Sequence, residues 1–435
     1  MPTKLEKAAK EKGIEYFLIS FVDILGKLRS KMVPARAIGP MEKNGAGFAG
    51  FAAYLNISPA DGDTMAIPDP DSLIQIPWRP EVGWLASDLY MDGEPIQASP
   101  RVALKKQLAK AEKLGYRMKT GVECEFFLIN QDGTGLADSM DTDAKPCYDQ
   151  HALMRVYPYA KEMCDSMLKM GFSPYQLDHE DANGQFEMNW DYDDALKTAD
   201  RHVFFKYMTR ELAERHGMRA TYMPKPFWDR TGSGCHAHIS IWDKTGKKNL
   251  FENKKDELGL SKLAYYFLGG IMQHTRSLAA IFNPTVNSYK RIKSGRVSSG
   301  CTYSPTTITY GGNNRTHMIR VPGGGRFELR LMDGAANPYL MQAGMLAAGL
   351  DGVEHKTDPG KPLHINMYEE GHTIKSSNKL PTDLQEALGL LDKSKVIRKA
   401  FGDELIDTFI RFKTDEWEDY SFHLTEWERE NTLDC

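Results

Sequence analysis

The stretch that most constrains the fold is Gly121-Val122-Glu123-Cys124-Glu125-Phe126-Phe127. Its β-branched and aromatic residues, without proline, predict a buried strand. Successive strand side chains point to opposite faces, so Glu123 and Glu125 should share a face, with Cα atoms about 6.6 Å apart at ~3.3 Å per residue. Two carboxylates on an apolar strand must either meet water at a sheet edge or bind cations. Their spacing suits one carboxylate for each of two metal ions.

The overall composition excludes several classes of protein. A net charge of −4 over 435 residues gives no electrostatic case for binding nucleic acid or an anionic membrane. The six cysteines form no C-x-x-C pair, which argues against a zinc ribbon or disulfide framework and favours a reduced, cytoplasmic compartment. The N-terminus lacks the apolar core of a secretory signal, and no apolar run is long enough to predict a membrane span.

The chain changes character near residue 100. Before it, the sequence predicts a short helix over 4–13, a hairpin over 16–33 and two short strands within 73–90. After it, segments bounded by glycine or proline predict helices over 101–114, 153–170, 195–217, 265–282 and 338–353. We therefore predict an α+β protein with a small strand-rich domain (1–100) and a large mixed domain (101–435).

A second acidic cluster lies in the stretch 179–187, His-Glu-Asp-Ala-Asn-Gly-Gln-Phe-Glu. Asn183 and Gly184 predict a turn, which places Glu180 on one arm of a hairpin and Glu187 on the other. A solvated acidic hairpin is the simpler interpretation, and a pair of cation ligands is the alternative.

Histidines follow on another predicted strand. After the glycine-rich turn at Gly232-Ser233-Gly234, alternation places His236, His238 and Ser240 on one face. Neutral imidazole binds divalent metals and can also donate to phosphate. Core histidines with hydrogen-bond partners remain an equally good interpretation of this pair.

Arginines gather later in the chain, at Arg291, Arg315, Arg320, Arg326 and Arg330. On the predicted strand 326–330, Arg326, Glu328 and Arg330 share a face. Arginine offers a two-pronged donor for carboxylate and phosphate. Surface ion pairs are the simpler interpretation, but acids, imidazoles and arginines without a nucleophilic serine or cysteine motif favour metal-assisted phosphoryl transfer. The sequence has no Walker P-loop and no kinase glycine loop.

Taken in order, these motifs resemble glutamine synthetase. The matching segments are E-C-E-F-F, H-E-x-x-x-G-Q-x-E, M-P-K-P before G-S-G-x-H-x-H, N-P-x-x-N-S-Y-K-R, N-R-x-x-x-I-R, R-F-E-L-R and A-A-N-P-Y-L. The resemblance covers nearly the whole chain. It implies a β-grasp N-terminal domain, a large α/β catalytic domain, and active sites formed between neighbouring subunits of a dodecamer of two hexameric rings.

The resemblance also implies an activity and a set of site residues. Such an enzyme joins glutamate to an amine with ATP, through γ-glutamyl phosphate, using two or more Mg²⁺ or Mn²⁺ ions. One ion would be held by Glu125, Glu180 and Glu187, and the other by Glu123, His236 and Glu328. Arg315, Arg320 and Arg326 would neutralise the phosphoryl group, while Arg291, Arg330, Gly232 and the matching Thr231 would hold glutamate. His238, Ser240 and Tyr192 would contact ATP.

Three departures from the family pattern concern the amine. The family has an aspartate in an F-D-G-S-S motif, whereas the matching stretch, 47–53, holds Ala49 and Phe51 and no acid. The flap glutamate expected six residues after Arg291 is Val297, and no acid lies between Arg291 and Gly300. The asparagine expected before G-S-G is Thr231.

The missing acids suggest methylamine as the substrate in place of ammonium. An alkylammonium has fewer N–H donors and an apolar group, which Ala49, Phe51 and Val297 would accommodate. A base is still needed, since a primary alkylamine has a pKa near that of lysine, ~10.4. Asp63 and Glu180 are the candidates. Glutamine synthetase activity with ammonium, a ligase for a longer amine, and a non-catalytic structural or regulatory protein are the alternatives.

Overall fold

The N-terminal part of the chain forms the sheet that its alternating residues predict. The structure, a computed structural model, describes residues 1–53, 55, 57–294, 296–297, 299–374 and 379–435. The strands of this sheet are β1 (Tyr16–Val22), β2 (Leu28–Pro34), β3 (Ala46–Phe48), β4 (Thr64–Pro68), β5 (Ile74–Gln75), β6 (Val82–Met91) and β7 (Glu94–Pro95). Their order is β2-β1-β6-β4-β3, with β5 and β7 also paired to β6. The predicted hairpin is present as β1 and β2, and β1 pairs in parallel with β6.

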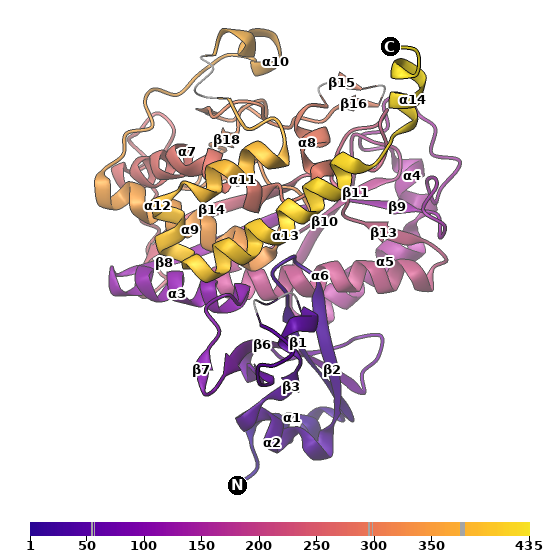
Figure 1. Cartoon of the computed structure of the whole chain (residues 1–435), viewed down its shortest axis with the longest axis vertical. Helices are drawn as coiled ribbons and strands as arrows, with labels where there is room; N and C mark the ends of the chain where they lie inside the picture. The colour runs from indigo at the N-terminus through magenta and orange to yellow at the C-terminus, as the bar shows by residue number, and fades with distance from the viewer. Residues whose placement is uncertain (54, 56, 295, 298, 375–378) are drawn as a thin grey trace.

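Helices α1 (Lys4–Lys12) and α2 (Ile38–Asn44) belong to this β-grasp-like part, which lies at the bottom of Figure 1 in indigo. The larger part lies above it and contains one mixed and one antiparallel sheet with helices around them. The first, called here the catalytic sheet, has the order β12-β8-β14-β19-β18-β17. Its strands are β8 (Tyr116–Cys124), β12 (Asp193–Asp194), β14 (Cys235–Asp243), β17 (Tyr310–Gly311), β18 (Ile319–Arg320) and β19 (Phe327–Leu329). The α+β prediction is confirmed.

The second sheet of the larger part has the order β10-β11-β9-β13. Its strands are β9 (Phe126–Ile129), β10 (Pro174–His179), β11 (Gln185–Trp190) and β13 (Arg219–Thr221). Beside these sheets lies a small hairpin of β15 (Arg296–Val297) and β16 (Gly300–Cys301).

The prediction of one continuous strand around Glu125 is wrong. The chain leaves the catalytic sheet after β8 and enters the second sheet as β9, so that Glu125 lies between the two strands. The cause is a double contact with Gly234: the Glu125 amide donates to the Gly234 carbonyl at 3.1 Å, and the Gly234 amide donates to the Glu125 carboxylate at 2.8 Å. The Gly234 amide thus donates to the Glu125 side chain and not to its backbone carbonyl. The regular pairing of β8 with β14 therefore stops before Glu125.

The helices of the larger part follow the predicted segments, with one difference. The segment 153–170 forms α4 (Gln150–Arg155) and α5 (Tyr157–Lys169), because Pro158 in the first turn of α5 has no amide to continue the preceding helix. The other helices are α3 (Pro100–Lys113), α6 (Ala195–Arg215), α7 (Lys262–Phe282), α8 (Val286–Ile292), α9 (Pro338–His355), α10 (Met367–Glu370), α11 (Leu384–Asp392), α12 (Lys395–Phe401), α13 (Asp403–Phe422) and α14 (Glu426–Thr432). Among the described residues, no helix combines the length and apolarity needed to cross a membrane.

Helices α7 and α9 pack with their backbones in close contact in the core of the larger part. A Cβ added at Gly270 would lie 2.2 Å from the Ala348 carbonyl, and one at Gly352 would lie 2.2 Å from the Tyr266 carbonyl. Glycine is therefore required at both positions, because any side chain would push the two backbones apart.

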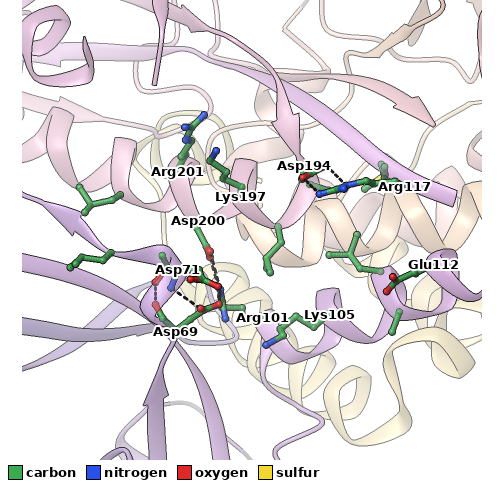
Figure 2. A pocket seen from close by; sticks show the side chains of 18 of the residues that line it. Asp69, Asp71, Arg101, Lys105, Glu112, Arg117, Asp194, Lys197, Asp200 and Arg201 are labelled. Atoms are coloured by element: carbon green, nitrogen blue, oxygen red, sulfur yellow. Dashed lines mark hydrogen bonds and ion pairs between the residues drawn. The ribbon is translucent and has the colours of Figure 1, made fainter. Parts of the chain in front are cut away.

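A buried arginine joins the N-terminal part to the larger part. Arg101, on α3, is only 3% exposed and donates to Asp69 and Asp88 at 2.8 Å and to Asp200 at 2.9 and 3.0 Å. Asp69 and Asp88 belong to the N-terminal part, and Asp200 lies on α6. Figure 2 shows Arg101 turned toward Asp69 and Asp200 at the edge of a cavity of about 640 Å³ between the two parts.

We predict that Arg101→Ala lowers the free energy of unfolding by about 3–5 kcal/mol, since Asp69 and Asp200 lose their buried cation and Asp88 keeps only the half-exposed Lys105. Arg117→Ala is the matched control. Arg117 pairs with Asp194 in the same cavity, but its side chain is 49% exposed, so its loss should cost about 0–1 kcal/mol. Chemical unfolding at fixed protein concentration measures both. Equal destabilisation by the two variants would contradict the assignment of Arg101 as the junction.

Candidate active site

Cross-strand register in the catalytic sheet brings five predicted site residues together in two neighbouring rows. Glu123 on β8 is opposite His236 on β14, and His238 is opposite Glu328 on β19. Glu328 is in turn opposite Arg320 on β18. His236 Nδ1 lies 3.5 Å from a Glu123 oxygen and 3.6 Å from a Glu328 oxygen, and His238 Nε2 lies 2.8 Å from Glu123. The predicted ligand set Glu123, His236 and Glu328 is thus a single cluster.

The hairpin of β10 and β11 brings a second acidic group to the same place. Glu187 lies on β11, and Glu180 directly follows β10, as the sequence predicts. Carboxylate oxygens of Asp178, Glu180 and Glu187 lie within 4.8 Å of one another. Glu125 faces the same space, with one oxygen 3.8 Å from His236 Nε2. The division of the strand at Glu125 therefore does not separate the two predicted ligand sets.

The two halves of this cluster differ in charge compensation. Burial and the nearby Glu125 and Asp181 raise the pKa of Glu180 to about 8. Burial, with Glu123 and Glu180 nearby, raises the pKa of Glu187 well above its usual value. Among the described residues, no neighbouring cation offsets the mutual repulsion of these acids.

The other half is already neutralised by protein groups. Burial raises the pKa of Glu123, but hydrogen bonds from His236 and His238 outweigh it and lower that pKa below the usual value. Likewise, the Arg330 charge overcomes burial and lowers the pKa of Glu328. Carboxylates with one or two imidazoles form a donor set that divalent Mg²⁺ or Mn²⁺ accepts. The residues present fit such ions, most clearly at the uncompensated acidic half.

Two cavities meet at this cluster. One, of about 190 Å³, is lined by the acids together with Arg330, and it is called here the acidic cavity. The other, of about 630 Å³, extends along β8 and β14 and is called here the aromatic cavity. Glu123, Arg315 and Arg320 line both. Two of the arginines predicted to neutralise a phosphoryl group therefore lie where the cavities join.

The aromatic cavity contains the residues predicted to contact a nucleotide. His238, Ser240, Tyr192 and Arg326 line it, and Tyr192 is 55% exposed. Trp242 also lines this cavity without having been predicted to. Its ring is stacked on that of Tyr192 with centroids 6.3 Å apart, and its Nε1 donates to Ser240. Its signal was present in the sequence, because Trp242 continues the alternation of His236, His238 and Ser240.

The glycine turn before β14 closes one side of the acidic cavity. Thr231 and Gly232 line it. Gln185 connects this turn to the cluster of acids. Its Nε2 donates to Glu125 at 3.1 Å and to the Gly232 carbonyl at 3.2 Å, and its Oε1 accepts from the Thr231 hydroxyl. Gln185 belongs to one of the matching sequence motifs, but no role was predicted for it. Its place on the same strand face as Glu187 was the available signal.

Arg330 and Arg291, both predicted to hold glutamate, occupy different places. Arg330 lines the acidic cavity and pairs with Glu328. Arg291 is fully buried behind the glycine turn, donates to the Leu331 carbonyl at 2.9 Å, and lies where a Cβ on Gly232 would meet its Cγ at 2.9 Å. Among the described residues that line the acidic cavity, Arg291 is not found, so in this chain it supports the turn from behind.

The predicted amine-pocket residues lie elsewhere in the described chain. Ala49, Phe51 and Asp63 belong to the N-terminal part, where Phe51 is 51% exposed. Neither cavity is lined by any of these three or by Val297. Val297 pairs with Gly300 across the hairpin β15–β16, and Gly300 lies against the Asp181 carboxylate, so this hairpin borders the acidic cavity.

Residues 97–432 of this chain match the family described as glutamine synthetase, catalytic domain. The chain belongs to the glutamine synthetase family. A glutamine synthetase of Rhizobium leguminosarum bv. phaseoli is 55% identical over 434 residues, which cover 100% of both chains. A glutamate–methylamine ligase of Methyloversatilis universalis is 44% identical over 442 residues, covering 100% of this chain and 99% of its own. The expected resemblance is confirmed.

Solved structures agree with this family assignment. A GmaS/ADP complex is 59% identical, covers 100% of both chains and superposes with a TM-score of 0.96. A GmaS structure without ligand is 58% identical, covers 99% of both chains and superposes with a TM-score of 0.94. The glutamine synthetase fold with a β-grasp-like N-terminal region is therefore shown for this chain.

We predict that divalent-metal affinity rises with pH up to about 8, because the raised pKa of Glu180 means that a proton must leave before the ion binds. Isothermal titration with Mn²⁺ across pH 6–8.5, in buffers of different ionisation enthalpy, counts the protons released. Glu180→Gln should bind more weakly and release fewer protons. A proton count independent of this substitution would contradict the assignment.

Proposed function

We propose that this chain is an ATP-dependent ligase that joins the γ-carboxylate of glutamate to methylamine and forms N-methyl-L-glutamine. The observation that carries the proposal is the meeting of the acidic and aromatic cavities at Glu123, Arg315 and Arg320. A nucleotide in the aromatic cavity would present its terminal phosphate at this junction. A carboxylate in the acidic cavity would reach the same point from the other side.

The reaction would proceed in two displacements. A γ-carboxylate oxygen of glutamate attacks the γ-phosphorus of ATP, ADP leaves, and γ-glutamyl phosphate forms. The amine nitrogen then attacks the γ-carbon, and inorganic phosphate leaves. Arg315, Arg320 and Arg326 would stabilise the negative charge of the transferring phosphoryl group, which is the main requirement of such catalysis.

The donor set described above would hold two or more Mg²⁺ or Mn²⁺ ions. Glu123, His236 and Glu328 would hold one, and Glu125, Glu180 and Glu187 the other. When bound, these ions supply positive charge that offsets the phosphate oxygens and the crowded acids. The clustering of all six residues also argues against the non-catalytic alternative.

Glutamate would be held between the glycine turn and the arginines. Arg330 in the acidic cavity would pair with the α-carboxylate, and the Gly232 backbone and the Thr231 hydroxyl would add hydrogen bonds. Arg291 would act from behind by keeping Gly232 in place. Gln185 would couple this turn to Glu125, so that substrate and cation sites keep a fixed spacing.

The amine preference rests on the wall around Glu180. Cys147, Tyr148 and Tyr303 line the acidic cavity beside it and offer a surface to a methyl group. The flap segment between Arg291 and Gly300 contributes no acid to surround an ammonium ion. Glu180, with a pKa of about 8, would accept the proton of the incoming alkylammonium. Ammonium is the second candidate, because a relative 55% identical is named glutamine synthetase.

We predict that kcat/KM for methylamine exceeds that for ammonium by at least about tenfold, or about 1.4 kcal/mol of transition-state stabilisation. Initial rates of ADP formation with glutamate, Mg²⁺ and each amine measure this ratio, with ethylamine as a test of pocket size. ADP release without amine sets the background. A higher kcat/KM for ammonium would make the chain a glutamine synthetase with an altered amine site.

The amine pocket further requires a second copy of the chain. Ala49, Phe51 and Asp63 lie outside both cavities of their own chain, so a neighbour must supply them if they bind the amine. We therefore propose a homo-oligomer, a dodecamer of two hexameric rings, in which the domain 1–100 of one subunit completes the domain 101–435 of the next. A cytoplasmic location, expected from the thiol pattern, belongs to the same proposal.

We predict complementation between two inactive variants, Phe51→Asp and Glu328→Gln. Co-assembled subunits would place a wild-type N-terminal domain beside a wild-type catalytic domain at about one quarter of the sites, by random assortment in a closed ring. Activity of the mixed oligomer measures this. Mixing Arg315→Ala with Glu328→Gln is the control, since both changes lie in one half of the site and restore nothing. No recovery in the first mixture would indicate sites within single chains.

A further inference from the structure

A cluster of two thiols and an imidazole lies on the other face of the catalytic sheet from the acids. Cys124, Cys235 and His202 place their ligand atoms within 4.8 Å of one another. Both cysteines are 0% exposed and His202 is 1% exposed. The reaction proposed above uses none of these side chains.

Strand alternation produces this arrangement. Cys124 follows Glu123 on β8, and Cys235 precedes His236 on β14, so both thiols point away from the acidic cavity. Cys124 and Cys235 are register partners. The next pair along, Glu125 and Gly234, is hydrogen-bonded, so the cysteines form a non-hydrogen-bonded pair, whose Cα atoms approach to about 4.5 Å. Helix α6 covers this face and contributes His202.

His202 has no strong hydrogen-bond partner in the described part of the chain. Its Nε2 lies 3.9 Å from the Cys235 sulfur, and its Nδ1 is buried without any partner. A buried polar group left unsatisfied costs about 1–3 kcal/mol. Nε2 is therefore the ring nitrogen that faces the cluster, and a cysteine sulfur is what it meets there.

We propose that Cys124, Cys235 and His202 form a binding site for one soft, thiolate-preferring cation of the Cu⁺ type. Thiolate and imidazole ligands select soft cations over the Mg²⁺ and Mn²⁺ that suit the acidic cavity. Zn²⁺ generally takes four ligands, whereas this enclosed cluster offers three in the described chain and no exposed fourth position, which favours Cu⁺.

The local charges also suit a monovalent ion. Lys206, one turn after His202, lies on the same helix α6 and donates to the Gly334 carbonyl at 2.6 Å. Two thiolates, one Cu⁺ and the Lys206 ammonium sum to zero. A neutral group of this kind avoids the large cost of an uncompensated buried charge.

A cation at this site would stabilise the catalytic sheet from the face opposite the acids. Cys124 lies between Glu123 and Glu125 in the chain, and Cys235 is next to His236, so a cation on this face would link the two strands that carry the acids. A ligand that binds only the folded state raises its stability in proportion to the logarithm of its concentration. The expected effect is therefore on thermal stability, and it can be read without an activity assay.

The test is a competition for Cu⁺ between the reduced full-length protein and bicinchoninate, a coloured Cu⁺ chelator, in excess Mg²⁺. We expect one equivalent of Cu⁺ per chain, bound at least about tenfold more tightly than by Cys235→Ala, together with a higher melting temperature on loading. His202→Asn, which keeps both thiols, should also weaken the site. Cys164→Ala is the control, because Cys164 is on α5 outside the cluster.

Two results would overturn the proposal. The first is equal Cu⁺ uptake and equal thermal shift in wild type, Cys235→Ala and His202→Asn. The second is a loss of two hydrogen masses on exposure to copper, with a Cys124–Cys235 cross-linked peptide, which would show a disulfide in place of a cation site. If Cys235→Ala does not fold, the His202→Asn comparison decides the question.

Discussion

The double contact between Glu125 and Gly234 determines the geometry of the whole site. It ends β8, directs the chain into a second sheet and keeps the Glu125 carboxylate pointed at His236. The second sheet carries the hairpin with Glu180 and Glu187. Without this change of sheet, the four glutamates that line the acidic cavity could not come to it from two sheets. A local irregularity in pairing thus builds a site that a regular sheet would not contain.

The acids that this geometry gathers are unequally compensated, and that inequality organises the chemistry. On one side, imidazole and guanidinium groups already balance Glu123 and Glu328. On the other side, burial and mutual repulsion raise the pKa of Glu180 and Glu187. The uncompensated side attracts a cation and, in its protonated range, can also exchange a proton with an amine. Arg315 and Arg320 lie between the two sides, where phosphate charge would pass.

Much of this site was predictable from local pattern. Alternation placed His236, His238 and Ser240 on one face, and the turn at Gly184 correctly predicted the arms that bear Glu180 and Glu187. The break at Glu125 was not predictable, because it depends on Gly234, more than a hundred residues later in the chain. The burial of Arg291 was also hidden, since no local signal distinguishes an arginine that binds substrate from one that supports a glycine turn. The predicted amine-pocket residues line neither cavity of their own chain, so their role stays a prediction.

The junction at Arg101 has a consequence for how the molecule comes apart. Its three carboxylates exceed the positive charge of Arg101 and the adjoining Lys105 by one unit. Burial raises the pKa of Asp69, but the hydrogen bond and charge of Arg101 outweigh it and lower that pKa below its usual value. The stability that this pair contributes is present above the ordinary aspartate pKa and is lost as pH falls through the lowered one. Acid would therefore weaken the joint between the two parts through protonation of Asp69, and Glu123 and Glu328 of the catalytic sheet, whose pKa values are also lowered, would respond to acid in the same direction. The response of this joint to acid therefore depends on the guanidinium of Arg101.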